Sequence, residues 1–272
     1  MIRRPITESR IVPHRYVRSN EDMNDLLSPF TALLIGTFVA AGMVKGVTGM
    51  GLPTVAMGIL GAVMPPATAA ALLVVPSLVT NLWQLLAGPV LMHLLRRLGL
   101  MMLGIGLGTV TGSLMLARVD SDATSLALGA ALVAYAGYAL ASPSLIVPAR
   151  LEPWLSPLVG LATGLITGAT GVFAIPAVPY LQALRLEKDQ LIQALGLSFT
   201  TSTIALGIGL ALHDALRLEE LGLSSLAVLP ALAGMWLGQR IRARISPEVF
   251  RIGFLLLLLM LGLELLSRPL RN

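Results

Sequence analysis

Long runs of apolar residues, separated by short charged or turn-forming breaks, dominate this chain of 272 residues. A helix that crosses the hydrocarbon core of a bilayer needs about 20 apolar residues. The apolarity of the runs is continuous and does not alternate with a period of two, which favours helices over the strands of a barrel. The pattern therefore predicts an all-α polytopic membrane protein. The apolar stretches lie at about 30–64, 67–92, 98–117, 123–147, 155–184, 190–212, 221–239 and 249–267.

The first and fifth stretches are long enough to be bent or doubled, so we expect eight to ten spans. Each contains a Gly-rich segment that ends in proline, at residues 46–53 and 168–176. A helix broken inside lipid leaves backbone N–H and C=O groups unpaired, and this costs several kcal/mol unless protein, water or a ligand satisfies them. Broken helices at matching positions of two halves are typical of carriers that hold their substrate at the junction of the halves.

The two Gly-rich segments belong to a longer internal match. Gly46 aligns with Gly168, 122 residues later, and the same offset pairs Thr48 with Thr170. Downstream the offset grows slowly to 126, and the match pairs Ser77 with Thr200, Thr80 with Thr203, Gly108 with Gly234, Gly112 with Gly238 and Arg118 with Arg244. We therefore predict two homologous repeats of four to five helices, at 30–147 and 155–268. A weak self-match between Gly-rich membrane helices is the alternative interpretation.

Composition and charge narrow the class of protein further. Charged residues make up 12% of the chain, against about 25% in a typical soluble domain, and hydrophobic residues make up 56%. The net charge is +5, but no basic stripe with interleaved aromatic residues is present, so we expect no nucleic-acid partner. There is no cysteine, and the three histidines are scattered, so we expect no metal site and no cofactor.

Charge at the ends of the spans gives a partial orientation. The polar segment 1–29 carries five arginines, which suggests a cytoplasmic N-terminus. The arginines at 240, 242 and 244 then fall on the opposite side, against the rule. Four spans in each half would make the repeats parallel and five would make them inverted, and the charge pattern leaves both open.

The repeated Gly-rich segments, the Ser/Thr-rich spans 69–81 and 194–203, and the spaced glycines that follow resemble the sulfite exporter TauE/SafE family. The resemblance covers about residues 30–268. It implies proton- or gradient-linked movement of sulfur-containing anions such as sulfite or organosulfonates. We therefore expect an exporter of a small anion in the bacterial inner membrane, with alternating access from one half rocking against the other. The second copy departs from the pattern, because Phe173 and Ala174 stand where the first copy has Gly51 or its neighbour.

Lys45 is the sharpest candidate for an anion contact. It lies within an apolar stretch, immediately before the first Gly-rich segment, and a charged residue in a membrane helix usually faces a cavity or a partner. Freed N–H groups beside it would also favour an anion. The alternative is a lysine that extends to the membrane interface. The predicted substrate-binding residues are Lys45, Gly46, Thr48, Gly49, Gly51, Asn81, Gly168, Thr170, Gly171 and Thr200.

Alternatives exist for these residues and for the function. The threonine hydroxyls could bond nearby carbonyls, and the glycines could serve helix packing. An intramembrane enzyme would need a nucleophile and a base, and His213 lies at a span edge, so we expect no enzyme. Carriers of another solute such as a carboxylate, and a non-transporting scaffold, are the remaining alternatives. The expected partners are a small anion and the lipid bilayer. A coupling ion (proton or sodium) and a homo-oligomer stay open.

Overall fold

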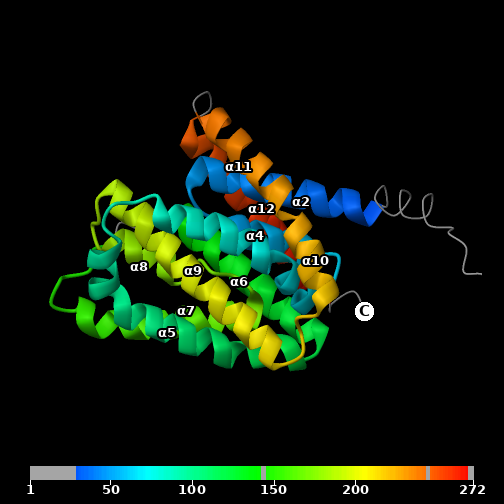
Figure 1. The fold of residues 1–272 in the computed structure, drawn as a ribbon, viewed down its shortest axis with the longest axis horizontal. Coiled ribbons are helices and arrows are strands. Elements are labelled where there is room, and N and C mark those ends of the chain that lie inside the picture. Colours follow the sequence, from blue (N-terminus) through cyan, green and yellow to red (C-terminus); the bar gives the residue numbers. More distant parts are fainter. Residues whose placement is uncertain (1–28, 142–144, 243–245, 269–272) are drawn as a thin grey trace, which may run out of the picture. The chain divides into compact units, whose positions relative to one another are not determined.

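The computed structural model describes residues 29–141, 145–242 and 246–268, and every regular element in them is a helix (Figure 1). Seven of these helices are long and apolar enough to cross a membrane, with residues 218–242 counted as one, in agreement with the predicted polytopic membrane protein. The helices are α2 (Pro29–Thr48), α3 (Leu52–Gly61), α4 (Pro66–Leu86), α5 (Leu91–Arg118), α6 (Ser121–Ala141), α7 (Glu152–Thr170), α8 (Ala177–Ala183), α9 (Lys188–Leu212), α10 (Leu218–Leu226), α11 (Val228–Arg242) and α12 (Pro247–Ser267).

Both Gly-rich segments contain a helix end. Helix α2 stops at Thr48, and Gly49 and Gly51 take positive φ angles of 79° and 99° before α3 begins. Helix α7 stops at Thr170, where Gly171 has a φ of 69°. These left-handed conformations suit glycine, which lacks the Cβ that makes them costly for other residues. The glycine pattern thus places a helix terminus within each long apolar stretch.

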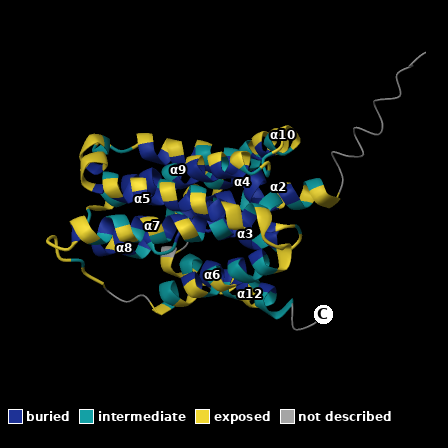
Figure 2. Cartoon of the chain, turned by 90° about the horizontal axis from the view of Figure 1, so that it is seen from below, coloured by how far each residue is buried: buried dark blue, intermediate teal, exposed yellow. Residues whose placement is uncertain are grey.

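The described residues from Leu34 onward form one compact unit, and α4 and α9 lie at its centre. About 67% of the apolar window of each of these two helices is buried, against 28% for residues 218–242 and for α12. Figure 2 shows that the outer helices have one buried and one exposed face. Large apolar side chains such as Leu107, Trp236 and Met260 are exposed on those faces. In a bilayer such faces meet lipid.

Helices α4 and α9 run antiparallel. The Asn81 amide donates to Thr203 Oγ1 over 3.2 Å, whereas the Gln193 amide, ten residues earlier on α9, donates to the Leu85 carbonyl over 2.9 Å. Residue numbers therefore increase along α4 in the direction in which they decrease along α9. Figure 1 shows the two helices beside each other.

Helices α6 and α12 are also antiparallel. Arg251, near the start of α12, donates to the Ala139 carbonyl near the end of α6 over 3.3 Å. Gly262 lies further along α12, and its Cα faces the earlier Gly129 of α6 so closely that an added Cβ would be 2.9 Å from the Gly129 carbonyl oxygen.

Glycines bring α7 and α5 together in parallel. A Cβ on Gly164 would overlap the Ile105 carbonyl oxygen, and a Cβ on Gly168, one turn later, would overlap the Thr109 carbonyl oxygen. Small residues allow this backbone approach in membrane helices. For Gly168, assigned above to the substrate site, the contact partner is therefore a neighbouring helix.

Helices α2 and α11 pack in the same way. A Cβ on Gly42 would overlap the Ala231 carbonyl oxygen, and a Cβ on Gly46 would overlap the Met235 carbonyl oxygen. The two helices are parallel, because one turn forward on α2, from Gly42 to Gly46, corresponds to one turn forward on α11, from Ala231 to Met235. Gly46, also assigned to the site, thus serves as a helix contact.

Candidate functional site

Lys45 lies in the last turn of α2 and is 4% exposed. Its ammonium group donates to the Thr80 hydroxyl over 3.2 Å and to the Asn81 side-chain oxygen, both on α4. The Asn81 amide in turn donates to the Thr203 hydroxyl on α9. One hydrogen-bonded network thus joins α2, α4 and α9, and it brings together the predicted site residues Lys45 and Asn81. The interface position offered as the alternative for Lys45 does not fit this burial.

The network supplies dipoles to Lys45 but no formal negative charge. Among the described residues, the ion pairs are Arg97 with Glu152 and Arg268 with Glu264. Taking a charge out of water costs several kcal/mol, and one hydroxyl and one amide oxygen offset only part of that cost. An anion beside Lys45 would supply the missing countercharge.

Several hydroxyl groups near this network have no hydrogen-bond partner in the described part of the chain. Thr200 and Ser202 on α9 and Ser77 on α4 are all buried in this state. Ser77 precedes Asn81 by four residues and Thr200 precedes Thr203 by three, so each shares a helix face with the network. Buried polar groups without partners are uncommon in folded proteins. These hydroxyls are available as donors to an oxyanion, which fits the predicted role of Thr200.

Thr48 and Thr170 close the two helix ends in matching ways. Thr48 Oγ1 donates to the Val44 carbonyl over 2.9 Å and accepts from the Met50 amide over 3.3 Å. Thr170 Oγ1 donates to the Ile166 carbonyl over 2.6 Å and accepts from the amide two residues on over 3.2 Å. In both, local backbone carbonyls take the hydroxyl hydrogen, and for Thr48 the Met50 carbonyl, at 2.8 Å, is a second acceptor. This is the alternative raised above for these two residues.

The glycines with positive φ differ in their surroundings. A Cβ on Gly49 would meet nothing within 4 Å, so the backbone conformation is its requirement. Gly51 precedes α3 as its N-cap. A Cβ on Gly171 would come within 2.8 Å of the Met57 sulfur on α3, so the second Gly-rich segment lies against the helix that follows the first.

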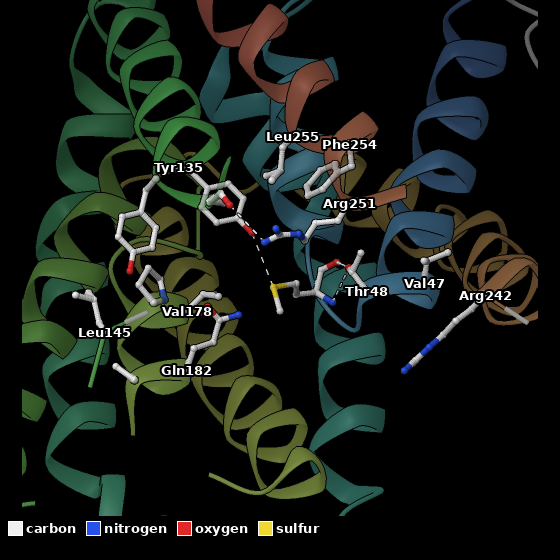
Figure 3. Close-up of a pocket in the computed structure, with 15 residues that line it drawn as sticks. Val47, Thr48, Tyr135, Leu145, Val178, Gln182, Arg242, Arg251, Phe254 and Leu255 are labelled. Atoms are coloured by element: carbon white, nitrogen blue, oxygen red, sulfur yellow. Dashed lines mark hydrogen bonds between the residues drawn. The ribbon is translucent and has the colours of Figure 1, made fainter. Parts of the chain in front are cut away.

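A cavity of about 520 Å³ adjoins the first Gly-rich segment (Figure 3). Its lining comes from the end of α2, from α6, α8, α11 and α12, and from the chain before α7. Of the predicted site residues it includes Thr48. The residues that line it include Val47, Thr48, Tyr135, Val178, Gln182, Arg242, Arg251, Phe254 and Leu255.

Comparison with known proteins identifies the family. The family model described as Sulfite exporter TauE/SafE matches residues 34–265. The chain belongs to the sulfite exporter TauE/SafE family. This confirms the resemblance seen in the sequence, and it makes the chain a multi-pass membrane protein of a transporter family, with the lipid bilayer and a small anion as the implied partners. No curated protein and no solved structure matches the chain.

Sequence reasoning about this TauE/SafE protein missed the two charged residues among the described lining of the cavity, Arg242 and Arg251. Arg251 stands near the start of the last apolar stretch, 249–267, where an arginine also fits a membrane interface. The arginine was therefore visible in the sequence, but its position did not distinguish a cavity residue from a residue at the membrane interface. Tyr135 and Gln182 gave no signal, because only the packing of α6 and α8 brings them to the first Gly-rich segment.

Proposed function

We propose that this protein exports a small anion, such as sulfite or an organosulfonate, across the bacterial inner membrane, and that Lys45 is the countercharge of the anion. The observation that carries the proposal is the burial of Lys45, with hydroxyl and amide partners, where α2 meets α4 and α9. A fixed cation beside unpartnered hydroxyls suits an oxyanion, because charge-assisted hydrogen bonds are the strong ones. Asn81 and Thr200 would complete the site.

We further propose that residues 30–147 and 155–268 are inverted repeats, comprising α2 to α6 and α7 to α12. The sequence match pairs α4 with α9, and its continuation past Arg118 and Arg244 at the same offset of 126 would pair α6 with α12. Both pairs are antiparallel. Two halves related by a two-fold axis in the membrane plane would have this arrangement.

Helix contacts support the same relation. In the match, α2 corresponds to α7 and α11 corresponds to α5. The glycine contacts of α2 on α11 involve residues that map onto those of α7 on α5. Gly42 on Ala231 corresponds to Gly164 on Ile105, at offsets of 122 and 126. Each repeat would therefore pack its first helix against the other repeat, and rocking of these units would expose the Lys45 network alternately to the two sides.

The test is anion flux in liposomes that contain the purified full-length protein. Wild-type protein should move radiolabelled sulfite, and Lys45→Met should reduce the flux about tenfold or more, because a lost charge-assisted contact is worth about 1.5–3 kcal/mol. Lys188 is an exposed lysine at the start of α9, and Lys188→Met is the matched control that should keep wild-type flux. Folding of each variant is checked by gel filtration and thermal unfolding.

Two outcomes would contradict the proposal. Undiminished sulfite flux in a folded Lys45→Met variant would remove Lys45 from the site. Wild-type protein that is folded in liposomes but moves neither sulfite nor organosulfonates would favour the non-transporting scaffold.

A further inference from the structure

Helix α4 contains a proline at its middle, and this residue removes one hydrogen bond from the helix. Pro76 has no N–H, so the Leu72 carbonyl, four residues earlier, lacks its usual partner within the helix. An unpaired backbone group in lipid costs several kcal/mol, and a side chain of a neighbouring helix can satisfy it. The turn of α4 that ends at Pro76 therefore needs a donor from outside the helix.

Ser224 of α10 supplies this donor. Its hydroxyl donates to the Leu72 carbonyl over 2.7 Å, and the same oxygen accepts from the Val75 amide over 3.1 Å. Ser224 is completely buried, whereas Leu223 and Ser225 beside it on α10 are exposed. One hydroxyl of α10 thus bonds the backbone of α4 twice, at the turn that Pro76 interrupts.

The α4 groups around the Lys45 ammonium group follow Pro76 directly. Ser77 is the next residue, and Thr80 and Asn81 lie about one turn later. Thr80 Oγ1 accepts from Lys45 and donates to the Pro76 carbonyl over 2.8 Å. A hydrogen bond weakens steeply when its distance and angle are lost. The contacts of these groups therefore depend on how the turn before them is held.

We propose that Ser224 is a positioning residue of the anion site. It holds the interrupted turn of α4, and it thereby sets where Ser77, Thr80 and Asn81 lie relative to Lys45. Ser224 acts through the backbone of α4. The role rests on the proposed function, because the groups that it positions surround the proposed anion. Since α10 belongs to the second proposed repeat and α4 to the first, the bond also links the site in one repeat to the position of the other.

The first test is the thermal unfolding midpoint of the full-length protein in detergent. Ser224→Ala should lower the midpoint by about 2–6 °C, because the Leu72 carbonyl would be buried without a partner. In a Pro76→Ala background the alanine N–H restores the bond within the helix, so Ser224→Ala should then lower the midpoint by less than half as much. An equal loss in both backgrounds would overturn the proposal, because the hydroxyl would not be replacing the missing donor.

The second test is the affinity of the same proteins for sulfite, measured by isothermal titration. Ser224→Ala should weaken sulfite binding about fivefold or more. Pro76→Ala should also weaken it, without lowering the midpoint, because the closed turn moves Thr80 and Asn81. Ser225 is exposed and donates to the Leu221 carbonyl within α10, and Ser225→Ala is the matched control that should keep both the affinity and the midpoint.

The outcomes separate this inference from the proposed function. Wild-type sulfite affinity in folded Ser224→Ala protein would overturn the positioning role, and normal sulfite flux in liposomes would then leave the proposed function standing. Weakened binding in Ser224→Ala, together with a wild-type protein that binds sulfite but does not move it, would uphold the positioning role and reject transport. A folded wild-type protein that binds neither sulfite nor organosulfonates would overturn both.

Discussion

At the scale of single residues, Asn81 has the most specific position. It accepts from Lys45 and donates to Thr203, so it couples the buried charge to α9. Replacement of its amide by a carboxylate would place a permanent countercharge beside the ammonium group, and the pair would no longer need an anion. We therefore expect Asn81→Asp to fold as well as the wild type while sulfite flux falls about tenfold or more.

The measurement for Asn81→Asp is sulfite flux in liposomes together with the thermal unfolding midpoint in detergent. Thr111 lies on the exposed face of α5, and Thr111→Asn is the control for the effect of a polar substitution within a span on folding and flux. An Asn81→Asp protein with wild-type flux would show that the network does not bind the transported anion.

Residues of the site were predictable where the chemistry is unusual for lipid. A lysine and an asparagine within apolar stretches were candidates for the site because each needs a partner there, and the structure joins the two by a hydrogen bond. Their contact with an anion stays a prediction. The expected donor role of Thr48 and Thr170 stays a prediction, since their hydroxyl hydrogens bond local carbonyls in this structure. The contact that α6 and α12 make at Arg251 has no signature in local sequence.

At the scale of helices, glycine contacts set the approach of α7 to α5. A methyl group on Gly164 would overlap the backbone of α5, whereas one on Gly106 would meet nothing within 4 Å. Gly164→Ala should therefore lower the free energy of unfolding by about 1–3 kcal/mol. Gly106→Ala, the matched control in α5, should leave it unchanged or raise it by up to about 1 kcal/mol, because alanine is the better helix former.

Denaturant unfolding in detergent, followed by circular dichroism, compares the two alanine variants. Equal stabilities for Gly164→Ala and Gly106→Ala would mean that the close approach of the helices is not required. The result tests the packing alone and does not depend on what the protein transports.

Helices were more predictable than their arrangement. Apolar length predicted the spans, and glycine with proline predicted the helix ends near residues 48 and 170. The direction of one helix relative to another depends on contacts between residues more than 100 positions apart, such as Asn81 with Thr203. Charge at the span ends could not supply it, and the proposal of inverted repeats draws on those contacts instead.

At the scale of the whole molecule, the proposed inverted repeats are unequal in charge. The match places Thr167 opposite Lys45, and Thr167 is buried near the end of α7 as Lys45 is near the end of α2. The Thr167 hydroxyl donates to the Val172 carbonyl over 3.1 Å. If the repeats are related as proposed, a lysine at position 167 would approach Thr203 on α9 as Lys45 approaches Thr80 on α4, and Thr203 is bonded to Asn81.

This relation predicts that the charge can be moved between the repeats. Lys45→Thr should lose sulfite flux, and the double variant Lys45→Thr/Thr167→Lys should regain a measurable part of it, because the ammonium group would again lie beside Asn81 and Thr203. Thr163→Lys, one turn earlier on α7, in the Lys45→Thr background is the control for added charge alone and should not restore flux. A folded double variant that is as inactive as Lys45→Thr would mean that the repeats are not interchangeable around the anion. The charge of the site would then have to come from α2, and the close approach of α7 to α5 would be the role left for α7.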